Sequence, residues 1–444
     1  MQVPIVLFWF RRDLRLSDNA GLYHALTSGF PVLPVFIFDQ DILDQFPAGT
    51  DRRVEFIHNT LKAMFGVLQA LGSSLEVKHG KPLEMLGMLT AQYDVKAVYA
   101  NHDYEPEAIR RDEQVARFLE SKGIAFHTYK DQVVFEKHEV VKDDGTPYRV
   151  FGAYRKRWMK KLSDFYLSSY PTEKYQHNFF QTSPIPIIRL EEIGFTQSGE
   201  PTFPPTELPK TIIRTYELTR DLPSLAGTSR LGLHLRFGTV SVRALTRQAL
   251  QLNAVWLGEL IWREFFMMIL FHFPHVSGRP YNLEYEHMAW LNQEDQFERW
   301  CNGTTGYPIV DAGMRELNAT GFMHNRVRMI VASFMVKHLL IDYRWGEAYF
   351  AGKLLDYDMA ANNGNWQWCA GTGCDAAPYF RVFNPETQAK KFDKHQEYIR
   401  KWVPELGTPA YPAPMVDHAF ARDRALRTYK AALNKARGIS SGSE

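Results

Sequence analysis

The first 130 residues alternate short β-type runs with amphipathic helical patterns, and this alternation constrains the fold more than any other feature. Helical patterns such as 52–71 and 105–121 lie between apolar runs that are typical of strands. Such an order predicts a parallel sheet with helices on both faces, a Rossmann-like α/β domain over residues 1–130. The apolar runs are 5–10, 32–38, 75–77, 97–100 and 124–128.

The chain changes character twice after this domain. Between 131 and 209 the periodicity is lost and prolines cluster, so we expect a long interdomain connector. From 210 to 438 strand signals fade and helical periodicity dominates, which predicts an all-helical domain. The short polar tail 439–444 is expected to be disordered. The predicted fold class is therefore α/β followed by all-α.

Composition and charge exclude several classes of protein. With 444 residues, 45% of them hydrophobic and 23% charged, the chain has material for two or three ordinary globular domains. A net charge of +2 leaves any nucleic-acid binding to a local patch. Three cysteines form no disulfide framework, and no His/Cys spacing fits zinc, so we expect no metal site. We find neither a signal peptide nor a membrane span, which favours the cytoplasm.

The segment 356–384 gathers acids, amides, tryptophans and small residues. Within it, Asp358, Asn362 and Trp366 follow one another at intervals of four, so they would line one face of a helix. Carboxylates are costly to bury unless fixed polar groups meet them, which suggests a wall for a polar, aromatic ligand. A tryptophan-anchored core helix is an equally good interpretation of this segment alone.

WLGELIWREFF places Trp256, Glu259 and Arg263 on one helix face, with Trp262 one turn beyond the carboxylate. The ordinary interpretation is a surface ion pair over a core tryptophan. The apolar surroundings make an idle carboxylate expensive, which favours a function instead. GTSRLG at 227–232 precedes a helical pattern and could hold phosphate, although Ser/Thr caps are common everywhere.

FMHNRVRM brings Asn325, Arg328 and Met329 together at i, i+3 and i+4. An amide can read a base-like edge, and a thioether adapts to an aromatic surface. The alternative is a polar cluster at a helix start, and for Met329 alone the hydrophobic core is the better interpretation. Basic residues between 381 and 401 alternate with aromatic ones, either as a solvated face or as the rim of a cavity for a flipped nucleotide.

Taken in order, these motifs resemble the photolyase/cryptochrome family, and most of all its class I cyclobutane pyrimidine dimer photolyases. The resemblance covers nearly the whole chain. It is carried by FWFRRDLRLSDN, TSRLG, ELIWRE, TGYPIVDAGMREL, MHNRVRM, AANNGNWQW and DAAPYFRVFNP. It implies an N-terminal α/β domain that can hold an antenna chromophore, and a helical domain that holds FAD beneath a DNA-facing cavity.

The resemblance also implies a role for single residues. The expected FAD contacts are Tyr216, Thr228, Ser229, Arg230, Leu231, Gly232, Trp256, Arg328, Asp356, Tyr357, Asp358 and Asn362, the last facing the flavin N5 position. The expected lesion pocket consists of Glu259, Trp262, Asn325, Met329 and Trp368, which with Asn362 form the expected catalytic set. The expected DNA contacts are Arg220, Arg263, Arg326 and Gln388.

The implied activity is light-dependent repair of cyclobutane pyrimidine dimers, that of a deoxyribodipyrimidine photo-lyase. Photoexcited reduced FAD would pass an electron to a flipped-out dimer and receive it back once the ring has opened. A dimer is poorly paired, so flipping it should cost less than the few kcal/mol of a normal base. The expected partner is UV-damaged DNA. We expect a monomer of bacterial type without an obligate protein partner, associated with the nucleoid when bound to DNA.

The alternative within this family is a cryptochrome-type blue-light receptor that signals to a protein partner. Asn362 favours repair, because plant-type cryptochromes carry an aspartate there and an amide cannot supply a proton to the flavin. Asn325 and Met329 match the dimer photolyases, whereas (6-4) photolyases have histidine-containing sequence in this region.

One position departs from the family pattern. The family's three-tryptophan relay falls on Trp366, position 343 and Trp290, but the middle residue is Tyr343. Because an oxidised tyrosine must lose a proton, we predict impaired or rerouted photoreduction of the flavin, with repair largely intact. The antenna could be a folate, a deazaflavin or a flavin. Glu105 stands where folate-binding members carry an acid, but helix-dipole stabilisation explains this residue better.

Overall fold

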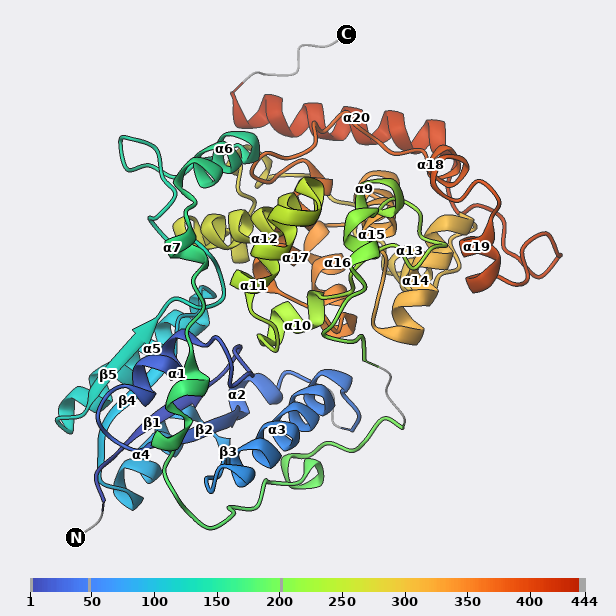
Figure 1. Cartoon of the computed structure of the whole chain (residues 1–444). Helices are drawn as coiled ribbons and strands as arrows, with labels where there is room; N and C mark the ends of the chain where they lie inside the picture. The colour runs from blue at the N-terminus through green and yellow to red at the C-terminus, as the bar shows by residue number, and fades with distance from the viewer. Residues whose placement is uncertain (1–2, 47–48, 200–202, 439–444) are drawn as a thin grey trace. The chain divides into compact units, whose positions relative to one another are not determined.

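The structure is a computed structural model that describes residues 3–46, 49–199 and 203–438 (Figure 1). Its packing separates two compact units, each assembled from three stretches of the chain. The first unit comprises Met1–Glu136, Leu162–Glu207 and Arg230–Gln251, and the second comprises Lys137–Lys161, Leu208–Ser229 and Leu252–Glu444. The domain limits predicted from the sequence stay predictions, and the predicted tail 439–444 lies outside the described residues.

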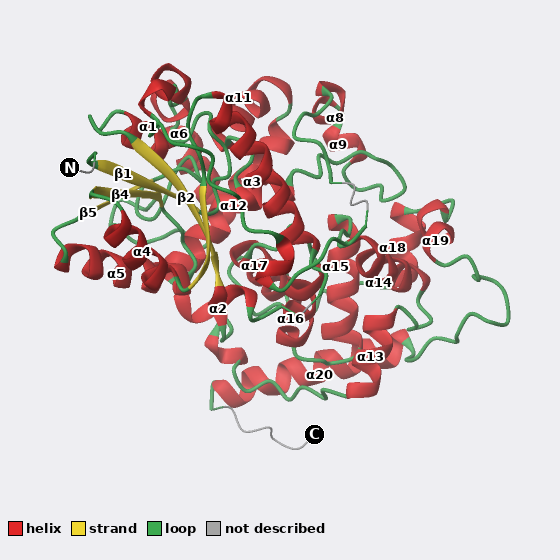
Figure 2. Cartoon of the chain, turned by 90° about the horizontal axis from the view of Figure 1, so that it is seen from below, coloured by secondary structure: helices red, strands yellow, loops and turns green. Residues whose placement is uncertain are grey.

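The first unit is built on a five-stranded parallel sheet in the order β3-β2-β1-β4-β5 (Figure 2, yellow). The strands are β1 (Ile5–Phe10), β2 (Val32–Asp39), β3 (Glu76–Gly80), β4 (Val95–Asn101) and β5 (Ala125–Tyr129). Each strand overlaps one of the apolar runs of the sequence, so the predicted parallel α/β fold is confirmed. The strand order reverses between β1 and β4, as in doubly wound folds.

Helices cover both faces of this sheet. The α-helices of the first unit are α1 (Ala20–Leu26), α2 (Gln40–Leu43), α3 (Arg52–Ala70), α4 (Pro82–Gln92), α5 (Pro106–Ser121), α7 (Asp164–Leu167), α10 (Gly232–Phe237) and α11 (Val242–Leu252). On one face Ile5, Leu7 and Trp9 of β1 share a core cluster with side chains of α4 and α5. On the other face α1 comes so close that a Cβ on Gly21 would lie 2.8 Å from the Phe8 ring, which is why this position requires glycine.

The described residues of the second unit form helices and loops without a β-strand, and those in 210–438 agree with the all-α domain predicted there. Its α-helices are α6 (Phe151–Lys161), α8 (Lys210–Arg214), α9 (Tyr216–Thr219), α12 (Ala254–His272), α13 (Glu294–Asn302), α14 (Pro308–Thr320), α15 (Asn325–Ser333), α16 (Tyr343–Lys353), α17 (Met359–Ala370), α18 (Pro385–Phe392), α19 (Glu397–Trp402) and α20 (His418–Ala436). A π-helical turn, η5 (Phe334–His338), continues α15. None of the helices in the described ranges is long and apolar enough to cross a bilayer.

The hydrophobic core of this unit fixes the position of α17. One buried cluster joins α13 to α17 and includes the side chains of Trp300 and Trp366. Helix α16 passes so near that a Cβ on Gly346 would lie 2.2 Å from the Trp366 ring. The glycine therefore permits the close approach of α16 to α17, which fixes the indole of Trp366.

Helix α6 lies inside the stretch that was predicted as a connector. It packs on α12, where the Trp158 Nε1–H donates a hydrogen bond to the Glu264 carboxylate at 2.6 Å. Both side chains are buried. This part of the stretch is thus an ordered element of the helical unit.

The buried His338 makes the stability of the helical unit depend on pH. Burial, reinforced by the neighbouring His418, lowers the pKa of His338 to about 3, whereas an unfolded histidine titrates near 6.5. Between these values only the unfolded chain takes up the proton, so the free energy of unfolding falls as the pH falls. At pH 4.5 we expect a loss of about 2–3 kcal/mol relative to neutral pH.

Urea unfolding of the helical unit between pH 4.5 and 7 measures this effect. His338→Leu should flatten that part of the pH dependence, because no group remains at this position to titrate. The exposed His275, changed to glutamine, controls for the loss of a histidine as such. A variant that keeps the wild-type slope would contradict the assignment to His338.

Candidate active site

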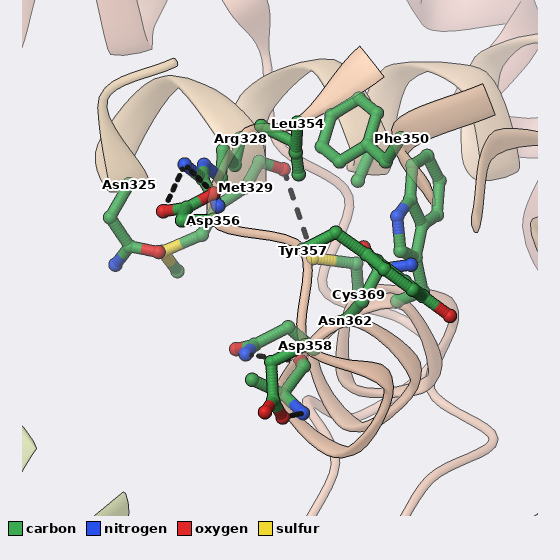
Figure 3. Close-up of a pocket in the computed structure, with 14 residues that line it drawn as sticks. Asn325, Arg328, Met329, Phe350, Leu354, Asp356, Tyr357, Asp358, Asn362 and Cys369 are labelled. Carbon is green, nitrogen blue, oxygen red and sulfur yellow. Dashed lines mark hydrogen bonds and ion pairs between the residues drawn. The ribbon is translucent and has the colours of Figure 1, made fainter. Parts of the chain in front are cut away.

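A pocket opens between α15 and α17, and we call it the α15–α17 pocket (Figure 3). It holds about 510 Å³ of empty space, part of it open to solvent. The residues predicted from the sequence that line it are Asn325, Arg328, Met329, Asp356, Tyr357, Asp358, Asn362 and Trp366.

The α17 wall of this pocket follows from helix periodicity. Asp358 precedes the helix, and its carboxylate accepts the Ala361 N–H at 3.1 Å as an N-cap. Asn362 and Trp366 follow at intervals of four, so all three side chains line the pocket. Trp366 also packs into the core and is 2% exposed. The segment is therefore both a core helix and the wall of a pocket.

An ion pair forms the opposite edge of the pocket. The Arg328 guanidinium donates to both carboxylate oxygens of Asp356, at 3.1 and 3.0 Å (Figure 3). Its Nε–H donates to the Met323 carbonyl at 2.8 Å. These bonds hold the guanidinium plane in one orientation. Because Asp356 balances the charge of Arg328, the pocket edge is polar without carrying a net charge.

The Asn362 side chain is held by the backbone of α16. Its Nδ2–H donates to the backbone carbonyl of Glu347 at 3.1 Å. The Glu347 side chain accepts a hydrogen bond from the neighbouring Asn363 at 3.0 Å, and burial raises the pKa of Glu347 to about 7. Glu347 was not predicted from the sequence, because nothing local marks a helix residue as a support for an amide on the next helix.

The chemistry of this pocket fits the isoalloxazine ring of FAD. An amide, a guanidinium–carboxylate pair and an N-cap carboxylate can meet the polar edge of a planar heteroaromatic ring. The thioether of Met329 and the apolar side chains of Phe350 and Leu354 can cover its faces. These donors, acceptors and apolar surfaces are what a flavin needs from a binding site.

Helix α12 carries a second polar group outside the α15–α17 pocket. Arg220 donates a hydrogen bond to the Glu259 carboxylate at 2.7 Å, and its guanidinium lies over the Tyr216 ring at 5.2 Å. Burial raises the pKa of Glu259 even though Arg220 opposes the shift. Trp256, one turn earlier, is buried. The Glu259–Arg220 pair joins a predicted lesion residue to a predicted DNA contact.

Two predicted lesion residues, Trp262 and Trp368, also lie outside the residues that line this pocket. Both are half-buried. Trp262 stacks face to face on Phe151, with ring centroids 3.6 Å apart, and Trp368 packs against the core cluster of the helical unit. Phe151 was not predicted from the sequence, because it lies in the stretch without periodicity.

The predicted DNA contacts are partly engaged by carboxylates. Arg326 donates to Asp221 at 2.8 Å and lies over the Phe392 ring at 4.3 Å, as Arg220 is engaged by Glu259 on α12. Arg263 and Gln388 are half-buried, on α12 and α18. A role for these side chains in binding DNA stays a prediction.

The expected electron relay is only partly visible as ring contacts. Trp366 has its nearest aromatic neighbours in Phe350, at 5.0 Å, and Trp300, at 6.1 Å between centroids. The Tyr343 hydroxyl is buried and has no hydrogen-bond partner among the described residues. Trp290 lies edge-on to Tyr429 at 6.1 Å. A ring contact between Trp366 and Tyr343 is not among those found in the described residues.

The predicted FAD residues of GTSRLG divide between the units. Thr228 and Ser229 belong to the helical unit, whereas Arg230, Leu231 and Gly232 belong to the α/β unit at the start of α10. Arg230 adopts the left-handed backbone conformation with φ of 51°.

Glu105, which stands where folate-binding members carry an acid, is bound by two arginines of the α/β unit. Arg12 donates to its carboxylate at 2.8 Å and Arg236 donates to the same oxygen. It is the N-cap residue of α5, but its side chain makes no capping hydrogen bond. Ion pairing therefore explains this acid better than stabilisation of the helix dipole does.

Both units contain residues that match models of known protein families. The family model for DNA photolyase matches residues 6–174, and the family model for the FAD binding domain of DNA photolyase matches residues 256–410. The deoxyribodipyrimidine photo-lyase of Synechococcus sp. is 37% identical, over 98% of this chain and 97% of that protein.

Solved structures agree with this result. The bacterial class III photolyase from Agrobacterium tumefaciens superimposes with a TM-score of 0.85 at 33% identity, over 97% of this chain and 98% of that one. The archaeal photolyase from Sulfolobus tokodaii gives a TM-score of 0.79 at 34% identity, over 96% and 99%. The family predicted from the motifs is confirmed: the chain belongs to the photolyase/cryptochrome family.

Proposed function

We propose that this protein is a deoxyribodipyrimidine photo-lyase that repairs cyclobutane pyrimidine dimers in DNA with light and uses FAD. The observation that carries the proposal is the α15–α17 pocket, which brings Arg328, Asp358 and Asn362 together around a space that suits a flavin. The name of the Synechococcus relative, which aligns over almost the whole of both chains, supports the same activity.

Arg328, Asp356, Tyr357, Asp358 and Asn362 would hold FAD in this pocket. Bound and reduced, FAD supplies the light-driven electron that opens the cyclobutane ring and takes it back afterwards. Asn362 can form hydrogen bonds with the cofactor but has no proton to lose at ordinary pH, which suits a cycle that leaves the protein unchanged. The Arg328–Asp356 pair can meet a polar ring edge without leaving a net charge buried.

Further residues complete the proposed FAD site by their family motifs. We assign Tyr216 and Trp256 to it, on α9 and α12. The remaining assigned residues are Thr228, Ser229, Arg230, Leu231 and Gly232.

The dimer would bind between aromatic and polar side chains. Trp262 and Trp368 would cover its apolar side, and Glu259 and Asn325 would form hydrogen bonds with its polar edges, with Met329 beside them. Arg220 already holds Glu259 Oε1 at 2.7 Å, so the carboxylate is oriented before the dimer arrives. Such preorganisation lowers the entropy lost on binding.

DNA binding can be tested by fluorescence anisotropy, with dimer-containing and undamaged oligothymidine in a series of salt concentrations. We expect preference for the dimer and affinity that falls as salt rises. Arg326→Ala should weaken binding and reduce the salt slope by about 1 if Arg326 contacts a phosphate. Arg422→Ala, a change of an exposed arginine on α20, is the matched control. Equal affinity for damaged and undamaged DNA would contradict the proposal.

A second, light-harvesting cofactor is implied for the Sulfolobus photolyase, which holds two FAD molecules. We propose that this chain binds an antenna group of the folate, deazaflavin or flavin kind through side chains other than Glu105. The carboxylate of Glu105 is bound by Arg12 and Arg236, so a ligand would have to displace both arginines to reach it.

We also propose that the protein acts as a monomer in the cytoplasm without an obligate protein partner, and that it joins the nucleoid when bound to UV-damaged DNA. The net charge of +2 supports localised rather than general binding to DNA. Light scattering on a sizing column should give the mass of one chain, and that of one chain plus oligonucleotide when a dimer is present.

A further inference from the structure

The Trp262 indole stacks on an aromatic ring from a distant part of the sequence. The Phe151 ring lies parallel to the Trp262 indole, with centroids 3.6 Å apart and planes 8° apart. Phe265 and Phe266 of the same helix lie 5.6 and 5.4 Å from that indole. Face-to-face contact with Phe151 fixes the plane of the indole, which the two α12 rings alone would leave freer.

Phe151 can act as a fixed support because α6 is firmly attached to α12. Tyr154 and Trp158, which follow Phe151 at three and seven positions, are each 1% exposed. Trp158 donates to the Glu264 carboxylate at 2.6 Å, and the Tyr154 ring lies 5.3 Å from Phe265. The first residue of α6 is therefore held by the buried residues that follow it.

The chain just before α6 is tied to the loop that follows α17. The Phe151 backbone N–H donates to the Asp375 carboxylate at 3.0 Å. The Cys374 thiol donates to the Arg149 carbonyl, also at 3.0 Å. Phe151 is thus held on two sides, by α12 through its ring and by residues 374–375 through its backbone.

We propose that Phe151 is a positioning residue for dimer recognition, which holds the Trp262 indole in the plane that the dimer stacks on. This inference rests on the proposed function, since it requires Trp262 to contact the dimer. It gives the start of α6 a part in the site, although this helix contains none of the family motifs that identified the other site residues.

Dimer binding in the dark by Phe151→Leu protein tests the inference without depending on repair activity. Leucine keeps an apolar side chain but removes the stacked ring. Loss of one aromatic pair should weaken binding of dimer-containing oligothymidine roughly 2- to 12-fold. Binding of undamaged oligothymidine and the content of FAD should stay at wild-type levels. Phe151→Tyr, which keeps the ring, should restore dimer binding.

Phe165→Leu is the matched control, because Phe165 is 80% exposed and belongs to the other unit. A double-mutant cycle with Trp262→Leu separates positioning from general stability: in the Trp262→Leu background, Phe151→Leu should have no further effect on dimer affinity. Asp375→Ala removes the backbone anchor and should weaken dimer binding in the same direction.

The outcomes distinguish this inference from the proposed function. If the wild type does not prefer the dimer, the proposed function fails. If the wild type prefers the dimer but Phe151→Leu binds it equally well or more tightly, the positioning role of Phe151 is wrong. Additive effects in the cycle would contradict it as well.

Discussion

Trp366→Phe is expected to abolish photoreduction of bound oxidised FAD by an external donor, while protein reduced chemically beforehand still repairs dimers. Trp366 is the tryptophan among the residues that line the α15–α17 pocket, and it is 2% exposed, so its indole can donate an electron directly to a flavin bound there. Phenylalanine fills most of the same space but is far harder to oxidise. The reduced-flavin absorbance under blue light measures the effect, with FAD content as the control for folding.

Tyr343→Trp should speed the same reaction. The Tyr343 hydroxyl has no hydrogen-bond partner among the described residues, and burial together with Glu347 raises the pKa of Tyr343. Oxidation of this phenol releases its proton, and no hydrogen-bond acceptor in the described part of the chain is in place to take it. Electron transfer through Tyr343 is therefore slow. If flash photolysis of the wild type shows prompt Trp290 radicals, and Tyr343→Trp brings no increase, the predicted impairment is wrong.

The ring contacts of Trp366 indicate how the reaction could be rerouted. Trp366 is 6.1 Å from Trp300, and Trp300 is 5.7 Å from both Tyr349 and Phe297. These rings form a path that does not pass through position 343. Trp300→Phe should then slow photoreduction in the wild-type background. The half-buried Trp402, changed to phenylalanine, is the control.

Asp131→Ala is expected to destabilise the α/β unit by about 3–5 kcal/mol, the usual cost of breaking a buried ion pair from one side. The Asp131 side chain is 0% exposed; it accepts hydrogen bonds from Arg15 at 2.6 Å and Arg243 at 2.8 Å, and from the Ala20 N–H at 3.1 Å. Burial alone would raise the pKa of Asp131, but the two arginines outweigh it and hold the pKa below its usual range.

The alanine variant would leave two arginines in the interior without this carboxylate, which is why the loss is large. Urea unfolding of the α/β unit measures it. Asp41→Ala, which removes an exposed carboxylate 3.8 Å from Lys81, should change the midpoint little. Equal effects of the two variants would show that the buried cluster contributes no more than a surface pair.

Where local periodicity decides which way a side chain points, its place in the fold was predictable from the sequence. The β1 run 5–10 reads as a covered strand because every residue in it is apolar, and Asp358, Asn362 and Trp366 share a wall because four residues make about one helical turn. The family motifs then gave these side chains a chemistry that periodicity alone left open.

Contacts between distant segments were not predictable in this way. Phe151 stacks on Trp262, and Glu347 supports Asn362, through backbones that meet only in the folded chain. The pairing of Arg326 with Asp221 also has no signal in the sequence. Such partners depend on the packing of whole helices, and local spacing carries no information about them.

Repair of dimer-containing oligothymidine by the reduced protein tests the central claim most directly. Under near-UV or blue light we expect the ultraviolet absorbance of thymine to recover, with many dimers repaired per protein molecule, and no recovery in the dark. A reduced, FAD-loaded protein that binds the dimer but restores no thymine in the light would contradict it.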